Sequence, residues 1–182
     1  MNMKKICVYC GSSAGHSPAF LESARGLGEQ LAKRDIGLVY GGASIGLMGA
    51  VADAVLEHGG QVTGIIPQSL LDREIAHSGL TELQVVNDMH ERKQIMAELA
   101  QAFIAMPGGF GTLEEMFEAL TWNQLDIHQK PCGLLNSNQY YDQLIRFLDH
   151  SVAQGFLKVP HRALLVADDD PGGLIDSLTA HW

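Results

Sequence analysis

The chain has 182 residues, 46% hydrophobic and 18% charged, which suits one globular domain with its own core over residues 1–182. Its formal net charge of −9 argues against a nucleic-acid-binding protein, because such proteins need a clustered basic surface. No run of 18 apolar residues appears, and the apolar run after Lys5 stops at Gly11, too short for a signal peptide. We therefore expect a cytoplasmic protein with no membrane partner.

Short apolar runs alternate with helical patterns along the whole chain. Several of the runs are continuous in Val, Ile and Leu, which is typical of strands buried on both faces of a parallel sheet. The expected strands are 5–10, 36–42, 61–67, 82–86, 102–109, 131–136 and 163–167. The expected helices are 17–34, 46–60, 87–101, 111–125 and 138–156. This alternation predicts a doubly wound α/β fold with a mostly parallel sheet of about seven strands and helices on both faces.

The ends of the helices carry local signals. Ser17 is a suitable cap with Pro18 in the first turn, a Gly-Gly pair ends the second helix, and Asn87 or Asp88 can cap the third. The segment 68–80 has no clear pattern and is compatible with a helix, a loop or a mobile flap.

Three glycine-rich turns follow the first, second and fifth expected strands, at 11–13, 41–46 and 108–112. Carboxyl ends of parallel strands share one edge of the sheet, so these turns are expected to face one crevice. Each leads toward a helix N-terminus, which favours an anion. A single glycine turn often serves packing alone, but three at one edge favour a phosphate site. No Gly-Lys-Ser/Thr follows, and the dinucleotide fingerprint is incomplete.

Charged residues lie next to these turns. Glu114 and Glu115 stand at the start of a helix, where a glutamate can have no role other than a favourable interaction with the helix dipole. Successive helical side chains diverge by about 100°, so one of the two can face a ligand while the other supports the loop. Arg92 and Lys93 stand near another helix start, the unfavourable end for cations unless an anion binds there, although a surface Arg-Lys pair is often merely solvated.

Other reactive residues form no complete motif. Cys7 and Cys10 have a C-x-x-C spacing, but they fall in or just after a strand with no second ligand pair, which favours buried or loop thiols over redox or zinc chemistry. The eight histidines show no metal-binding spacing, and no Gly-x-Ser-x-Gly elbow is present.

The stretch "PGGFGTLEE" at 107–115 resembles the P-G-G-x-G-T-x-x-E signature of the Lonely Guy (LOG) family, long described as lysine decarboxylase-like. The segments "CVYCGSS", "LVYGGASIGLMGAVADA", "IIPQSLLDREIAHSGL", "DMHERKQIM" and "LTWNQLDIHQKPCGLLN" resemble the family's other segments in the same order, from about Cys7 to Phe156. Ala43 departs from the pattern, because many members have a third glycine there.

The resemblance implies a Rossmann-like homodimer whose sites are partly completed by the second subunit, and a tetramer stays open. It implies hydrolysis of the N-glycosidic bond of a nucleoside 5′-monophosphate to free base and ribose 5-phosphate, with neither a metal nor pyridoxal phosphate. Arg92 and Glu115 take the catalytic positions. Positions for substrate contacts fall on Glu74, Arg92, Lys93, Gly108, Gly109, Phe110, Gly111, Thr112, Leu113, Glu114 and Thr121. Further residues expected in the crevice are Gly11, Ser12, Gly41, Gly42 and Met89.

Alternatives remain open at the level of the sequence. The base can be an N6-prenylated adenine, as in a cytokinin riboside monophosphate, or plain adenine, as for an AMP nucleosidase, or one of a broader set. A non-catalytic nucleotide- or cofactor-binding carrier on the same fold is the rival from another class. A lysine decarboxylase is a third reading, and Lys93 could form its Schiff base, although nothing nearby marks pyridoxal phosphate chemistry.

Overall fold

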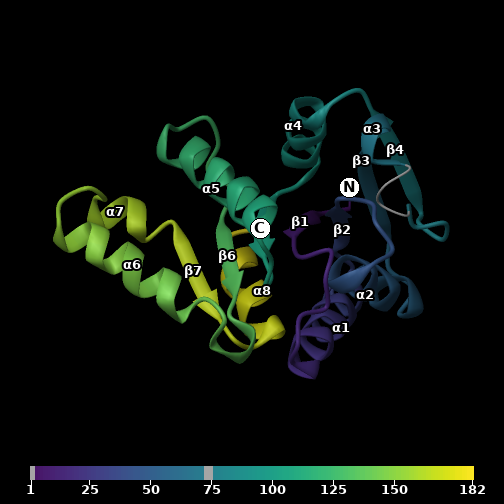
Figure 1. Ribbon diagram of the computed structural model, residues 1–182, viewed down its shortest axis with the longest axis horizontal. Coiled ribbons are helices and arrows are strands. Elements are labelled where there is room, and N and C mark those ends of the chain that lie inside the picture. The colour runs from purple at the N-terminus through teal and green to yellow at the C-terminus, as the bar shows by residue number, and fades with distance from the viewer. Residues whose placement is uncertain (1–2, 72–75) are drawn as a thin grey trace.

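Residues 3–71 and 76–182 are described by the computed structural model, and they form a seven-stranded sheet (Figure 1). Every pair of neighbouring strands is parallel, in the order β4-β3-β2-β1-β5-β6-β7. The strands are β1 (Lys5–Tyr9), β2 (Gly37–Tyr40), β3 (Val62–Pro67), β4 (Glu82–Val86), β5 (Ala102–Ala105), β6 (Cys132–Leu135) and β7 (Leu165–Asp168). Each coincides with an apolar run of the sequence, so the predicted Rossmann-like α/β fold is confirmed.

One face of the sheet is covered by α1 (Pro18–Lys33), α2 (Gly46–Glu57) and α8 (Pro171–Thr179). Helix α1 begins as predicted, because the Ser17 hydroxyl accepts a hydrogen bond from the Ala19 amide (3.4 Å) and Pro18 takes the first helical position. Leu27 and Leu31 of α1 pack into one cluster with residues of α2 and the sheet. The apolar stripe of α1 therefore becomes the core of this layer.

The opposite face is covered by α4 (Met89–Leu99), α5 (Phe110–Gln124) and α6 (Asp142–Ala153), which pack into a second cluster. Asp88 caps α4, because one carboxylate oxygen accepts hydrogen bonds from the His90 and Glu91 amides at 2.8 and 2.9 Å. The inner strands of the sheet are buried over most or all of their length, whereas the edge strands β4 and β7 expose part of their residues. This explains why the central strands read as continuous apolar runs.

The strand order reverses at β1, which pairs with β2 on one side and with β5 on the other. In a doubly wound sheet the helices leave toward opposite faces at such a point, and a crevice opens beyond the carboxyl ends of the strands. The glycine-rich turns after β1, β2 and β5 lie at this edge. The fold therefore brings together the turns that the sequence singled out.

Some boundaries differ from the prediction. Strand β5 ends at Ala105, four residues before the predicted end, and α7 (Val159–Arg162) and α8 were not predicted. In the segment 68–80, α3 (Gln68–Leu71) is a short helix, 72–75 lie outside the described residues, and Ala76 forms an isolated antiparallel bridge with Ala43. Among the described residues, no helix combines the length and the apolar character needed to cross a membrane.

Candidate active site

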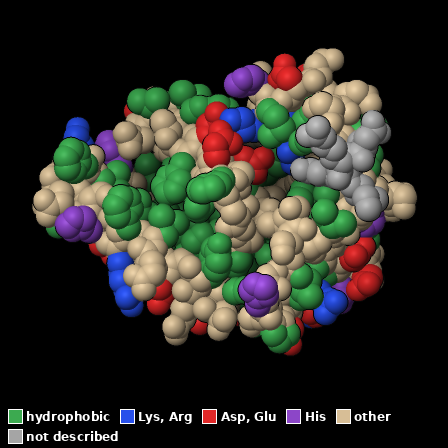
Figure 2. All heavy atoms as spheres, viewed as in Figure 1, with side chains coloured by type: hydrophobic (Ala, Val, Ile, Leu, Met, Phe, Trp, Pro, Cys, Tyr) green, Lys and Arg blue, Asp and Glu red, His purple; other side chains and the backbone are tan. Residues whose placement is uncertain are grey.

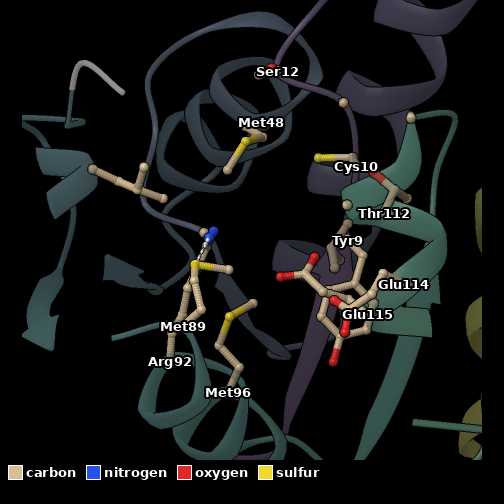
Figure 3. Close-up of a pocket in the computed structure, with 16 residues that line it drawn as sticks. Tyr9, Cys10, Ser12, Met48, Met89, Arg92, Met96, Thr112, Glu114 and Glu115 are labelled. Atoms are coloured by element: carbon tan, nitrogen blue, oxygen red, sulfur yellow. Dashed lines mark hydrogen bonds between the residues drawn. The ribbon is translucent and has the colours of Figure 1, made fainter. Parts of the chain in front are cut away.

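A cleft of about 310 Å³ opens where the strand order reverses, between the loops after β1, β2 and β5. Gly11 and Ser12 come from the first loop, Gly41 from the second, and Gly109, Gly111 and Thr112 from the third. The prediction that the three turns face one crevice is confirmed. Figure 3 shows the walls: α5 with its acidic residues on one side, and α4 with Met89, Arg92 and Met96 on the other.

The loop between β5 and α5 presents backbone amides to the cleft. Gly109 is the N-cap of α5 and has no side chain to cap the helix. The first backbone hydrogen bond of the helix runs from the Leu113 amide to the Gly109 carbonyl at 3.2 Å, and within the described residues the amides of 109–112 have no acceptor. Unsatisfied amides and the helix dipole make this end of α5 a favourable place for an anion.

The glycines of this loop are needed for two different reasons. A Cβ on Gly108 would overlap the Thr112 side chain, so the packing of the loop itself excludes a larger residue there. A Cβ on Gly109 or Gly111 would meet no heavy atom within 4 Å, and neither glycine has a positive φ. Neither the fold nor the backbone conformation therefore requires glycine at these two positions. The absence of side chains there leaves free space in the cleft.

Arg92 forms much of the wall on the α4 side and is buried, with 6% of its surface exposed. Its Nη1 donates to the Met89 sulfur at 3.6 Å, and a Cβ on Gly41 would overlap its Nη2, so Gly41 makes room for the guanidinium. Among the described residues Nε has no hydrogen-bond partner. A buried cation with an unused donor is costly, so its position is best explained by an anionic or oxygen-rich ligand.

Glu114 and Glu115 extend from the first turns of α5 into the cleft, opposite Arg92 (Figure 3). Glu114 is exposed and accepts a hydrogen bond from Lys93 Nζ at 2.6 Å, and the same ammonium donates to Glu118 at 3.1 Å. Burial alone would lower the pKa of Lys93, but the two carboxylates outweigh it and raise the pKa. Lys93 is therefore protonated and links α4 to α5 through two salt bridges.

Glu115 is half-buried and lies near the end of β1, where Tyr9 and Cys10 also line the cleft. Burial raises the pKa of the Cys10 thiol, and the negative charge of Glu115 adds to this effect. Burial raises the pKa of Tyr9 as well, with smaller contributions from Cys7 and Glu115. Both groups stay neutral at physiological pH, so the Tyr9 and Cys10 side chains near Glu115 carry no charge.

Comparison with known proteins agrees with these observations. A family model described as "Possible lysine decarboxylase" matches residues 48–178. The cytokinin riboside 5′-monophosphate phosphoribohydrolase LOG7 of Arabidopsis thaliana is 49% identical over 175 residues, which cover 96% of this chain and 81% of that protein. The cytokinin riboside 5′-monophosphate phosphoribohydrolase of Rhodococcoides fascians is 47% identical over 176 residues, covering 96% of this chain and 89% of that protein. The chain belongs to the Lonely Guy family.

Solved structures similar to this Lonely Guy protein include cofactor carriers. The molybdenum cofactor binding protein from Rippkaea orientalis superposes with a TM-score of 0.75 and 23% identity, over 99% of this chain and 98% of that chain. The molybdenum cofactor carrier protein of Chlamydomonas reinhardtii also gives a TM-score of 0.75 and 23% identity, over 98% of both chains. At this identity the likeness shows the shared fold alone.

The residues expected in the Lonely Guy site divide into three groups. One group lines the cleft: Gly11, Ser12, Gly41, Met89, Arg92, Gly109, Gly111, Thr112, Glu114 and Glu115. A second group is described but is not part of the cleft wall: Gly42, Lys93, Gly108, Phe110, Leu113 and Thr121. Glu74 lies outside the described residues. For all of them, contact with a substrate stays a prediction.

Sequence reasoning missed several residues that the structure places in the cleft wall, namely Tyr9, Cys10, Met48, Leu70 and Met96. The first two directly precede the first glycine turn, so their position at the carboxyl end of β1 could have identified them. Cys7 is buried in β1 and Cys10 lies just after it, as expected from the sequence. Among residues 3–71 and 76–182, no cluster of His, Cys, Asp and Glu side chains could hold a metal ion.

Proposed function

We propose that this Lonely Guy protein hydrolyses the N-glycosidic bond of a nucleoside 5′-monophosphate, releasing the free base and ribose 5-phosphate. The observation that carries the proposal is that Glu115 and Arg92 lie on opposite walls of one cleft (Figure 3), whose lining includes Gly109, Gly111 and Thr112 at the start of α5. Its relatives at 49% and 47% identity are named as phosphoribohydrolases of cytokinin riboside 5′-monophosphate. Their identity to this chain extends over 96% of it.

The phosphate is assigned to the N-terminal end of α5. The amides of Gly109, Phe110, Gly111 and Thr112 supply donors, and the bare glycines leave space for phosphate oxygens. The phosphate is not cleaved in this reaction. It serves as a remote handle, and its binding places the sugar next to the carboxylates one turn further along the helix.

The ribose is assigned to the middle of the cleft, beside Glu115. Breaking the bond between C1′ and the base builds positive charge on the sugar, which a carboxylate stabilises, and the same carboxylate can take a proton from the attacking water. Arg92 faces Glu115 across the cleft and has an unused Nε–H within the described residues. It would hold the sugar hydroxyls or the base and assist departure of the base.

The base is assigned to the apolar side chains of the cleft wall, which include Leu70, Met48, Met89 and Met96. Methionine side chains adapt to ligands of different shape, so this wall can accept adenine or an N6-prenylated adenine. We propose a cytokinin riboside 5′-monophosphate or AMP as the substrate, with the preferred base to be determined by rate.

We further propose a homodimer in which a second copy completes the site. Thr121 is exposed about two turns beyond Glu114 on α5, and its hydroxyl donates to the Phe117 carbonyl at 2.7 Å, outside the cleft of its own chain. Figure 2 shows hydrophobic side chains gathered over the part of the surface where α5, α6 and β7 lie. Strongly exposed apolar residues include Leu125, Ile127, Phe147, Phe156 and Val159. A contact between two copies would cover such a surface and bring Thr121 to the partner's cleft.

The direct test is to incubate the purified protein with AMP and with isopentenyladenosine monophosphate and to follow free base and ribose 5-phosphate by chromatography. Glu115→Gln keeps the size of the side chain but removes the carboxylate that would act as general base, so turnover should fall about 10²- to 10⁴-fold while nucleotide binding persists. Glu98→Gln is the matched control, since Glu98 lies on the exposed side of α4, bonded to Gln94, and should keep full activity. A fully active Glu115→Gln protein would contradict the assignment.

The same experiment separates the proposal from its alternatives. A nucleotide carrier on this fold would bind AMP without releasing adenine, and a lysine decarboxylase would release carbon dioxide from lysine and carry a yellow cofactor. A cytoplasmic location without membrane or nucleic-acid partners accompanies the proposal, supported by the net charge of −9 and the small polar ligand.

A further inference from the structure

Tyr140 holds the glycine loop of the cleft from outside. Its hydroxyl donates a hydrogen bond to the Gly108 carbonyl at 2.7 Å, although the two residues are 32 positions apart. Tyr140 does not line the cleft itself; it lines an adjoining hollow of about 370 Å³, together with Phe20 and Gly108, and this hollow shares Gly109 with the cleft. Nothing in the sequence pattern pointed to this residue.

The hydrogen bond is one of four that turn successive carbonyls of the loop toward the protein. The Met106 carbonyl accepts from the Tyr141 hydroxyl at 2.6 Å, the Pro107 carbonyl from the Gly11 amide at 3.0 Å, and the Gly109 carbonyl from the Leu113 amide at 3.2 Å. Tyr140 supplies the donor for Gly108, the remaining carbonyl of the run. The loop therefore has all of its carbonyls engaged between β5 and α5.

Fixing a carbonyl also fixes the next amide. The peptide unit is planar and trans, so the N–H of the following residue points opposite to the C=O. Holding the Gly108 carbonyl toward Tyr140 therefore turns the Gly109 amide away from Tyr140, and Gly109 itself lines the cleft. Gly109 lacks a side chain that could restrict this peptide unit, so without an external bond its orientation would be poorly defined.

Tyr140 is itself delivered by an unusual turn. Asn138 and Gln139 of the short 3-10 segment Ser137–Gln139 have φ of 51° and 59°, a conformation that non-glycine residues adopt at a cost of about 1 kcal/mol or more. The Asn136 side chain secures the turn by accepting from the Tyr141 amide at 2.7 Å. Strain of this kind persists only where the surroundings over-determine it, and here it carries the tyrosine ring to the loop.

The ring of Tyr140 is fixed independently of its hydroxyl. It makes edge-to-face contacts with Phe20 at 5.9 Å and with Tyr141 at 4.9 Å between ring centroids. Tyr141 is 2% exposed and belongs to the core, whereas Tyr140 is 45% exposed. Removing the Tyr140 hydroxyl should therefore leave the fold intact and loosen the Gly108–Gly109 peptide unit alone.

We propose that Tyr140 is a positioning residue for phosphate binding: through the Gly108 carbonyl it aims the Gly109 amide at the 5′-phosphate of the substrate. The inference rests on the proposed function, because it assigns the phosphate to the glycine loop. Tyr140 does not touch the substrate. It lowers the cost of ordering the loop when the phosphate binds.

The test compares Tyr140→Phe with the wild-type protein by calorimetric titration with AMP, ribose 5-phosphate and adenosine. Losing one positioning hydrogen bond should weaken AMP and ribose 5-phosphate about 3- to 10-fold, while adenosine, which lacks the phosphate, binds as before. In turnover the loss should appear in KM and leave kcat nearly unchanged, because the phosphate is held equally in the ground and transition states. Phe20→Leu is the control: it reduces the ring contact but leaves the hydroxyl bond, and it should weaken AMP less.

Two results would overturn the proposal: unchanged affinity of Tyr140→Phe for AMP, or equal weakening of AMP and adenosine, which would indicate a general structural effect. The outcome is independent of the chemistry. A wild-type protein that binds AMP without releasing adenine would refute the proposed hydrolysis, and the affinities of the variant would still decide the role of Tyr140.

Discussion

Replacing Gly111 by alanine should stabilise the protein and weaken its substrate binding at the same time. Gly111 lies in the first turn of α5, its φ is not positive, and an added Cβ would meet no protein atom within 4 Å. Alanine is favoured over glycine in a helix by about 0.5–1 kcal/mol, so the melting temperature should rise by about 1–4 °C for a domain of this size. The open space around Gly111 belongs to the cleft, and there the methyl group would displace a phosphate oxygen.

The loss of affinity should be much larger than a helix effect. Charge-assisted hydrogen bonds contribute about 1.5–3 kcal/mol each, so losing one bond to the phosphate should raise KM for AMP about 10-fold or more. Gly26→Ala is the matched control. Gly26 lies in α1, and its added Cβ would contact only Pro171 Cγ, at an ordinary van der Waals distance of 3.6 Å. It should be similarly stabilised with unchanged KM. A Gly111→Ala protein with the wild-type KM would show that the phosphate does not bind at this loop.

Two further predictions concern pH and thiol reactivity. Burial lowers the pKa of His128, so the folded protein favours the neutral ring. The free energy of unfolding should therefore fall as the pH drops through the unfolded pKa of about 6.5. Urea unfolding at pH 7.5 and 5.5 measures this loss, which should be smaller for His128→Asn than for the wild-type protein. Burial also raises the pKa of Cys132 to about 12 and that of Cys7 further. These two buried thiols should therefore react with an aromatic disulfide reagent at least about tenfold more slowly in the native protein than in denaturant, and equal rates would contradict their burial.

The fold could be predicted because its information is local. A strand buried on both faces must be apolar throughout, so β1, β2 and β5 were visible as continuous runs, and Ser17 and Asp88 marked helix starts by their capping chemistry. Helix α8 was missed even though Asp170 caps it in the same manner, accepting from the Gly173 amide at 2.7 Å. Its glycine-rich first turn weakened the helical pattern.

The site could be predicted only where its residues lie in the turns themselves. Gly11, Gly41 and Gly109 were found because parallel strands deliver their carboxyl ends to one edge. The contribution of Met96 depends on how α4 rotates over the sheet, and that of Tyr140 on a strained turn 32 residues beyond the loop it supports. Such long-range contacts leave no periodic trace in the sequence.

The tie between Lys93 and the two glutamates sets the width of the cleft. Arg92 is the neighbour of Lys93 on α4, and Glu115 is the neighbour of Glu114 on α5, so the ammonium that joins the helices also fixes the spacing of the two candidate catalytic groups. The entropy of bringing these groups together is therefore spent once, when the chain folds, and not in every reaction cycle. We therefore expect the spacing of Arg92 and Glu115 to be the same with and without substrate.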